Sequence, residues 1–439
     1  MTLAVRICVF IIVLIAWPSW AGPEQNSVLA DAGVERLRAI LDPYINDRLI
    51  PGYYLAIHDN KGMRVEVSDG WASEGEALES GPEVLYSIMS MSKPIVAFAT
   101  LRLVEQEKLG LDDPVKNYIP TFSKLVVAKE GKLNLATESL ERDVTIRDLL
   151  THTAGLTYSD TSYGREEVSK RYRELGLFDF GVEQNLQLDE QIQALVTLPL
   201  VSQPGSRFVY SASVDVVAHI LELITRQSFD SVLDELVLQP LGMMDTHLVV
   251  PTEKVSRLAS MYRPRRATYP IPGKYRQYQS YFSEPDGPKN FGQSKLSTVS
   301  VGDGLVTTAN DLSKFLSLLL NDGVHAGQRL VTKETVDMMF EHQLPNALGK
   351  NALVYNFGPR MIEVGFSFGL GIKLVAGGDP LEKTDHDYYF WEGAASTAFW
   401  IDRSSESFGM FLSQLYPTEF SPTSQLVEVS RTVGSNLGN

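Results

Sequence analysis

The sequence has almost no cysteine: Cys8 is the only one among 439 residues. It lies inside a hydrophobic run near the N-terminus and not at a cleavage signal, so a lipid anchor on a processed cysteine is not expected. If that run is removed, the remaining chain contains no thiol. Disulfides, a thiol nucleophile and cysteine metal ligands are therefore excluded.

The sequence also lacks basic clusters and histidines at metal-ligand spacing. Its formal net charge is −15, and an acidic surface of this kind repels nucleic acid and favours solubility. The seven histidines are scattered, with no H-E-x-x-H or similar motif. We therefore expect neither a nucleic-acid partner nor a metal site, and the length and 44% hydrophobic content predict a globular chain of two or three domain-sized units.

The first 21 residues have the organisation of a signal peptide. Arg6 supplies a positive charge, residues 7–17 form an apolar core, and Ser19-Trp20-Ala21 gives a small-x-small cleavage site. The apolar run is short for a membrane span, and no later segment approaches membrane length; an uncleaved anchor is the alternative. The predicted location is therefore periplasmic or secreted.

Strand patterns occur at both ends of the chain, which indicates one antiparallel sheet built from the two termini. The fold class predicted is α/β (α+β), with helices flanking the sheet and a mostly helical domain beside it. The predicted strands cover residues 53–58, 63–67, 366–375, 388–400 and 408–412, with a hairpin turn at 59–62. The predicted domains are a signal peptide at 1–21, an α/β domain at 22–95 and 301–439, and a mostly helical domain at 96–300.

Helix signals are clear at several places. Apolar spacing predicts a first helix over 31–48 and a helix over 213–227, and a final helix over 421–433. Thr145 and Asp148 form a capping box that opens a short helix, with His152 in its last turn, and Asn310 is expected to cap a helix over 311–321. Residues 262–292 show no periodicity, so they form either a wall of a binding site or surface decoration.

Ser90-x-x-Lys93 is the first candidate for catalysis. At the start of a helix, side chains three residues apart share a face, so the Lys93 amine can reach the Ser90 hydroxyl. A serine hydroxyl becomes a good nucleophile when an adjacent base takes its proton, and a desolvated lysine can be that base at neutral pH. The tetrapeptide alone is weak evidence, because a helix-start serine followed by a solvated lysine gives the same pattern.

A competing motif is Gly365-Phe-Ser367-Phe-Gly369, which fits the G-x-S-x-G nucleophile elbow. That elbow needs a strand before the serine and a helix after it, whereas residues 370–375 continue as a strand pattern. The Asp and His of a triad would also have to follow, and Asp385 and His386 are adjacent. We therefore interpret Ser367 as a structural serine of the sheet.

Six motifs in order resemble the class C β-lactamase-like serine hydrolases, which include penicillin-recognising peptidases and the family VIII carboxylesterases. The resemblance covers residues from about 30 to 415, and it implies an active site between a sheet domain and a helical domain. The matching segments are Ser90-Met-Ser-Lys93-Pro94, Leu109–Val115, Thr145–Leu156, Gln203–Ser211, Pro240–Met243 and Gly302-Asp-Gly-Leu305.

Carried over position by position, the resemblance implies that Ser90 is the nucleophile and Lys93 its partner. Tyr210, which fits the family's P-G-x-x-x-x-Y pattern, would be the second general acid/base. A core tyrosine at a helix start is the alternative for Tyr210. The resemblance implies no cofactor.

The sequence departs from the β-lactamase pattern at two places. Ala212 stands where β-lactamases have the asparagine of Tyr-x-Asn, and Lys383-Thr384-Asp385 lacks the glycine of the Lys-Thr/Ser-Gly strand. The better match for that strand is Trp391-Glu-Gly393-Ala394, which resembles the Trp-x-Gly version of the esterase branch.

In that version Gly393 allows close approach of the substrate backbone, and the N–H groups of Ser90 and Ala394 form the oxyanion hole. Trp391 puts a neutral ring where the cation would be, which favours neutral esters over β-lactams. Burial is then the main remaining cause that could lower the pKa of Lys93. A plain core aromatic is the alternative for Trp391.

The function expected is hydrolysis of small carboxylic esters through an acyl-enzyme on Ser90. The alternatives are a β-lactamase or D-Ala-type peptidase of the same fold and, from another class, a non-catalytic binding protein that uses the same cleft.

Overall fold

The computed structural model describes residues 23–60, 62–129, 137–159, 166–178, 186–265, 281–283, 300–357, 359–416 and 422–435. The predicted signal peptide and most of residues 262–292 lie outside these ranges. Among the described helices, none combines the length and the apolar character that a membrane span requires.

The main sheet of the described chain has eight strands, in the order β12-β13-β14-β15-β16-β1-β2-β3. Every neighbouring pair is antiparallel, and β1 from the N-terminal part pairs with β16 from the C-terminal part through Tyr54 opposite Leu412. The predicted sheet built from both termini is therefore confirmed. The strands are β1 Gly52–Asp59, β2 Gly62–Ser73, β3 Leu78–Glu79, β12 Val364–Phe366, β13 Gly371–Leu374, β14 His386–Gly393, β15 Thr397–Asp402 and β16 Ser407–Leu412.

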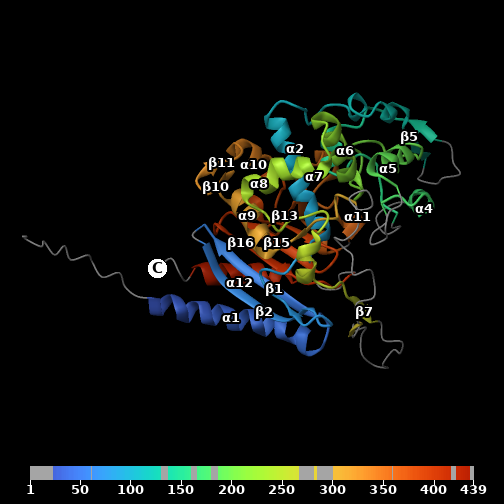
Figure 1. Cartoon of the computed structure of the whole chain (residues 1–439). Coiled ribbons are helices and arrows are strands. Elements are labelled where there is room, and N and C mark those ends of the chain that lie inside the picture. The colour runs from blue at the N-terminus through green and yellow to red at the C-terminus, as the bar shows by residue number, and fades with distance from the viewer. Residues whose placement is uncertain are drawn as a thin grey trace, which may run out of the picture.

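Helices cover both faces of this sheet (Figure 1). On one face α1 (Pro23–Asn46) packs against β2, and α12 (Thr423–Ser435) packs against α1, β15 and β16. On the other face lie α9 (Ala309–Leu320), which contacts β16, and α2 (Ser92–Glu105), which contacts α10 (Lys333–Phe340) and α6 (Ser213–Thr225). The remaining helices are α3 Ile146–Leu150, α4 Glu166–Glu174, α5 Leu188–Leu195, α7 Phe229–Leu233, α8 Gln239–Leu241 and α11 Val354–Phe357.

Two predicted strands are wrong in their extent, because each is a hairpin. Residues 366–375 divide into β12 and β13, and residues 388–400 divide into β14 and β15. The first turn is closed by Gly369, whose φ is +82° and which packs against Pro94. Both turns are buried and carry few polar residues, so the apolar pattern continues through them.

The predicted helices are present with shifted boundaries. The capping box at Thr145 is confirmed, but α3 ends at Leu150, so His152 follows the helix with a φ of +55°. The N-cap of α9 is Thr308 and not Asn310, because the Thr308 hydroxyl accepts the Asp311 N–H. The division into an α/β domain and a helical domain at 95/96 and 300/301 stays a prediction.

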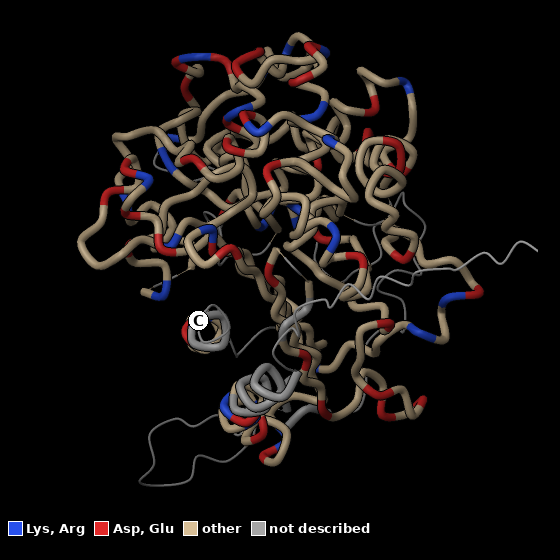
Figure 2. Tube along the Cα trace, turned by 90° about the vertical axis from the view of Figure 1, so that its left-hand side faces the viewer, with Lys and Arg blue, Asp and Glu red and all other residues tan. Residues whose placement is uncertain are grey.

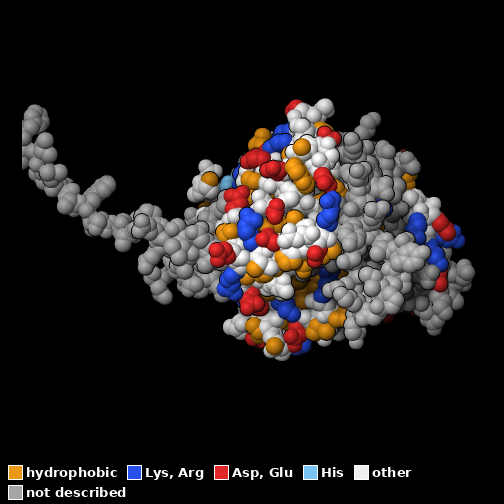
Figure 3. Space-filling model, turned by 90° about the horizontal axis from the view of Figure 1, so that it is seen from below, with side chains coloured by type: hydrophobic (Ala, Val, Ile, Leu, Met, Phe, Trp, Pro, Cys, Tyr) orange, Lys and Arg blue, Asp and Glu red, His pale blue; other side chains and the backbone are white. Residues whose placement is uncertain are grey.

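Charged residues of both signs are mixed over the surface. Lys and Arg positions are interspersed with Asp and Glu positions in the described chain (Figure 2). On the face seen from below, hydrophobic side chains lie among acidic and basic ones (Figure 3). The excess of negative charge is therefore distributed over many small groups of charged residues.

Candidate active site

Ser90 lies in a tight turn, η1 (Met89–Met91), which leads directly into α2. Met89 before it has a φ of +48°, a conformation that a residue with a side chain adopts only under constraint. The Ser92 hydroxyl supplies part of that constraint, because it donates to the Met89 carbonyl at 2.6 Å and accepts the Leu305 N–H at 3.1 Å. The turn thus fixes Ser90 at the helix start, with 8% of its surface exposed.

Lys93 follows one turn later and is buried. Its Nζ donates to Ser90 Oγ at 3.2 Å, as the spacing predicted, and also to the Gly302 carbonyl at 2.9 Å. The third acceptor is Asp303 Oδ1 at 2.8 Å. Lys93 and Asp303 thus form an ion pair in which their side chains are 1% and 5% exposed, respectively. The Lys93 amine therefore has hydrogen-bond acceptors from three residues of the site.

Asp303 is a residue of the site to which sequence reasoning gave no role. Ser90 Oγ donates to its Oδ1 at 2.6 Å, and the Tyr158 hydroxyl donates to its Oδ2 at 3.2 Å. It belongs to the Gly302-Asp-Gly-Leu305 motif, which the family resemblance included without a role for the carboxylate. An aspartate within an otherwise apolar, glycine-flanked segment was the available signal.

The ion pair changes the electrostatics expected for Lys93. Burial alone would lower the pKa of its amine, but the charge of Asp303, with a smaller contribution from Tyr210, outweighs burial. The pKa of Lys93 is therefore raised above its ordinary value. Burial, the cause named from the sequence that could lower this pKa, is therefore outweighed by the Asp303 charge.

Tyr210 lies beside Lys93 as the resemblance implied. Lys93 Nζ is 4.9 Å from the centroid of the Tyr210 ring, and the His152 ring is 4.6 Å away between centroids. Burial raises the pKa of Tyr210, while interactions with Lys93 and Ser90 oppose that rise. Burial and Lys93 keep the pKa of His152 well below its usual range, so this imidazole is neutral.

A second buried carboxylate, Asp215, lies close to the first. It accepts the Val301 N–H at 2.6 Å and the Ser300 hydroxyl at 3.1 Å, and Ser300 Oγ is 3.5 Å from Asp303. Burial, with the negative charge of Asp303 next, raises the pKa of Asp215 to about 7. Sequence reasoning missed Asp215 because its burial and its neighbour Asp303 arise only from the tertiary fold.

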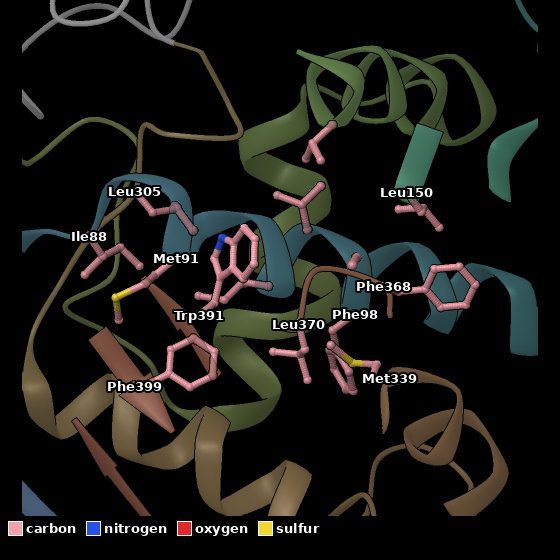
Figure 4. Close-up of a cluster of buried hydrophobic side chains, with 14 of the residues drawn as sticks. Ile88, Met91, Phe98, Leu150, Leu305, Met339, Phe368, Leu370, Trp391 and Phe399 are labelled. Carbon is pink, nitrogen blue, oxygen red and sulfur yellow. The ribbon is translucent and has the colours of Figure 1, made fainter. Parts of the chain in front are cut away.

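Trp391 lies on β14 within an aromatic cluster. Its ring centroid is 5.8 Å from that of Tyr210 and 5.2 Å from that of Phe366. Figure 4 shows it among buried side chains from several elements, including Met91 and Phe399. The ring is 3% exposed, and its buried Nε1–H has no hydrogen-bond partner in the described parts of the chain.

Gly393 and Ala394 follow at the end of β14, next to the Ser90 turn. A Cβ on Gly393 would lie 2.3 Å from the Ile88 carbonyl oxygen and 2.2 Å from Thr397 Oγ1. The glycine is therefore required for contact between β14 and the turn, which adds to the reason expected from sequence. Ala394 packs against a small apolar cluster that contains Met89, the residue before Ser90.

The other sequence candidates lie away from this cluster or have structural roles. Ser367 is buried in the β12–β13 turn, and its hydroxyl donates to the Met339 carbonyl. Lys383 is exposed and pairs with Glu341 at 2.7 Å, so the segment 383–385 is no counterpart of the family's lysine strand. Ala212 is fully buried at the N-cap of α6.

Comparison with known proteins gives matches over most of the chain. A family model described as Beta-lactamase matches residues 37–429. Protein Rv1367c of Mycobacterium tuberculosis is 32% identical over 344 residues, which cover 76% of this chain and 78% of that protein. Esterase EstB of Burkholderia gladioli is 33% identical over 228 residues, which cover 52% of this chain and 54% of that protein.

Among solved structures, that of "EstCE1, a hydrolase with promiscuous acyltransferase activity" is similar, with a TM-score of 0.73 and 24% identity. The alignment covers 93% of this chain and 100% of that chain. At this identity the similarity shows that the fold is shared.

Proposed function

We propose that this chain, which belongs to the Beta-lactamase family, is a serine hydrolase that cleaves carboxylic esters through an acyl-enzyme on Ser90. The observation that carries the proposal is the hydrogen bonding of Ser90 Oγ, which donates to a buried carboxylate at 2.6 Å and accepts from Lys93 at 3.2 Å. A serine between a proton acceptor and a cation is prepared for nucleophilic attack.

The oxyanion hole in this proposal consists of the N–H groups of Ser90 and Ala394. Contact between β14 and the Ser90 turn supports it, since Gly393 meets the Ile88 carbonyl and Ala394 packs against the apolar cluster that contains Met89. Loss of one such donor typically costs about 2.7–4 kcal/mol of transition-state stabilisation. Lys93 donates to Ser90 Oγ at 3.2 Å, and Tyr210 lies beside Lys93, so both are placed to act on the reacting oxygen.

The proposed substrates are small neutral esters. The position expected to hold a cation for a substrate carboxylate is occupied by Trp391, which is neutral and buried in an aromatic cluster. Ala212 provides no amide for an acylamino side chain and is itself buried. Two of the similar proteins point in the same direction, since EstCE1 is described as a hydrolase and EstB as an esterase.

A β-lactamase or D-Ala-type peptidase of the same fold is the second candidate, and a binding protein without catalysis is the third. The absence of a carboxylate-binding cation at Trp391 disfavours the second. The intact polar cluster around Ser90 disfavours the third, because a binding cleft does not require a buried ion pair at a serine. The proposed location is periplasmic or secreted, supported by the sequence of residues 1–21.

The test compares the wild type with Ser90→Ala on p-nitrophenyl butyrate and on nitrocefin. We expect Ser90→Ala to lose ester hydrolysis and a fluorophosphonate probe to add its mass to Ser90 in the wild type. Ser367→Ala is the matched control, because that serine is also buried but bonds only backbone carbonyls. Retained hydrolysis in Ser90→Ala would refute the mechanism, and a clear preference for nitrocefin would favour the lactamase alternative.

A further inference from the structure

The contacts of Lys93 favour its charged form. Nζ lies within donor distance of Ser90 Oγ, the Gly302 carbonyl and Asp303 Oδ1, at 3.2, 2.9 and 2.8 Å, and the Tyr210 hydroxyl also interacts with it. The Asp303 carboxylate forms a buried ion pair with the amine, which stabilises the ammonium. An ammonium has three hydrogens and no lone pair, so it cannot accept the Ser90 proton.

The Ser90 hydroxyl has one hydrogen, and Asp303 Oδ1 is its acceptor at 2.6 Å, while Lys93 donates to Ser90 Oγ. The Tyr210 hydroxyl interacts with the same serine. The 2.6 Å distance between Ser90 and Asp303 is typical of an O–H···O⁻ bond, which is shorter than a neutral hydrogen bond. The acceptor of the nucleophile's proton is thus a carboxylate.

Asp303 is held so that both of its oxygens accept. Lys93 and Ser90 donate to Oδ1, and the Tyr158 hydroxyl donates to Oδ2 at 3.2 Å. Burial, with the charge of Asp303 next, keeps the pKa of Tyr158 well above its usual range, so this phenol remains a donor. The Ser300 hydroxyl adds a longer contact to Oδ2 at 3.5 Å, and an ionised carboxylate, which has only acceptors, suits this set of donors.

The ionisable groups around Asp303 come from several elements. Lys93 on α2 is the cation, and Asp215 on α6 is a second carboxyl reached across Ser300. The phenols of Tyr158 and Tyr210 complete the surroundings, and His152 beside Tyr210 is neutral.

We propose that Asp303 is the general base that removes the Ser90 proton, and that Lys93 is a permanently charged group that positions both. This inference rests on the proposed ester hydrolysis at Ser90 and deepens it. In the first step the Oγ–acyl carbon bond forms, the carbonyl π electrons move to the oxygen, and the hydroxyl proton passes to Asp303. The oxyanion electrons then re-form the carbonyl as the carbon–alkoxy bond breaks, and Asp303 gives that proton to the departing alkoxide.

Deacylation repeats the sequence with water. A water molecule gives one proton to Asp303 as its oxygen adds to the acyl carbon, and the bond to Ser90 Oγ breaks. Asp303 returns the proton to Oγ. The products are one acid and one alcohol from one ester and one water, with Ser90, Lys93 and Asp303 restored.

The first test is Asp303→Asn, which keeps the size of the side chain but cannot accept a proton. A general base contributes about 10²–10⁴-fold, so we expect kcat at pH 7 to fall by that order while KM changes little. Removing the carboxylate also lowers the pKa of Lys93, so part of the activity should return at alkaline pH. Asp303→Glu should retain more activity at pH 7 than Asp303→Asn.

If Lys93 were the base in the wild type, the opposite result would follow. Loss of Asp303 would then release the amine, so kcat at pH 7 would stay unchanged or rise, and this outcome overturns the inference. Asp402→Asn is the matched control: Asp402 is fully buried and bonds Arg431 at 2.6 Å on the far side of the sheet, so its variant should keep kcat.

The pH dependence of kcat/KM of the wild type tests the inference even if the variants misfold. The acidic limb of kcat/KM reports the ionisation of the base in the free enzyme. If that base is a carboxylate, the midpoint of the limb shifts little between about 5 and about 40 °C, because carboxyl ionisation has little enthalpy. A limb that moves strongly with temperature indicates an ammonium or phenol and contradicts the inference. The Ser90→Ala variant distinguishes failure of the proposed ester hydrolysis from failure of the inference about Asp303. If Ser90→Ala is inactive while Asp303→Asn keeps its kcat, only the role of Asp303 is refuted.

Discussion

The α-carbon of Gly393 lies against the carbonyl oxygen of Ile88, so that a Cβ at this position would lie 2.3 Å from it. Ile88 is the second residue before Ser90, and its carbonyl also accepts from Thr397 Oγ1 and from the Met91 N–H. This contact fastens the end of β14 to the turn that carries the nucleophile. The position of Ser90 therefore depends on a residue three hundred positions away in the chain.

Gly393→Ala should impair catalysis more than folding. The added methyl group cannot be accommodated unless β14 or the Ser90 turn moves, and a small displacement separates Ala394 from Ser90. We expect kcat for p-nitrophenyl butyrate to fall by about 10²-fold, the order seen when an oxyanion donor is lost.

The control for that prediction is Gly409→Ala. Its Cβ would lie 2.1 Å from Cζ2 of Trp400, so the steric conflict is of the same kind but occurs inside the sheet, between β15 and β16. We expect this variant to lose thermal stability and to retain kcat per folded molecule. Equal loss of kcat in both variants would show that Gly393 has no special role.

Trp391→Phe should leave stability nearly unchanged. The indole Nε1–H is buried without a partner among the described residues, and removing a buried unsatisfied polar group is close to neutral. A phenyl ring can retain the contacts with Tyr210 and Phe366. We therefore expect a Tm within a few degrees of the wild type, measured by differential scanning calorimetry.

The matched comparison is Trp400→Phe. Trp400 is also fully buried and its Nε1–H also lacks a partner in the described chain, but it lies in β15 against Gly409. If only Trp391→Phe raises KM for esters, the indole ring of Trp391 shapes the substrate site. A large loss of stability in Trp391→Phe would contradict the argument from the unsatisfied donor.

The local part of the active site could be predicted from sequence, because it depends on helical spacing. Ser90 and Lys93 are one turn apart, and the 3.2 Å contact between them follows from that spacing alone. Tyr210 required the longer family motif, since its approach to Lys93 depends on how α6 packs against α2.

Asp303 could not be assigned a role in the same way. It is 210 positions from Lys93, and its effect on the lysine exists only once the two are buried together. Sequence reasoning considered burial of Lys93 without its counter-charge, and so missed the group that raises its pKa.

The two hairpins were not predicted from sequence, also because the deciding feature arises only in the fold. A turn is usually recognised by exposed polar residues, whereas the residues 394–396 between β14 and β15 are Ala-Ala-Ser, of which Ala395 is fully buried. The apolar pattern therefore ran through the turn without a break. The sheet and its antiparallel order were still predictable, because the alternation within each strand was intact.

Asp215→Asn should change how stability depends on pH. The pKa of Asp215 is about 7 in the folded protein, raised from 3.8 by burial and then by Asp303. Between these two values the folded state holds a proton that the unfolded state has released. The contribution of Asp215 to the free energy of unfolding is therefore greatest below pH 3.8 and is lost as the pH rises towards 7.

At about 1.36 kcal/mol per pKa unit, the full loss amounts to roughly 4 kcal/mol. Asparagine has no proton to lose, and its amide can still accept the Val301 N–H and meet the Ser300 hydroxyl. We expect the difference in unfolding free energy between Asp215→Asn and the wild type to grow in favour of the variant from pH 4 to pH 8. Urea unfolding at several pH values measures this difference.

Asp402→Asn gives the opposite sign and so controls for the mere loss of a buried carboxylate. Hydrogen bonds from Ser404 and Arg431 outweigh burial and hold the pKa of Asp402 below its usual value. Its stabilisation is therefore present above the unfolded pKa and is lost as the pH falls. Because the two carboxylates titrate in opposite directions, Asp402→Asn should lose most stability relative to the wild type at neutral pH, where Asp215→Asn gains. Parallel curves for the two variants would show that Asp215 is ionised throughout, and that Asp303 and Asp215 carry two negative charges beside Lys93.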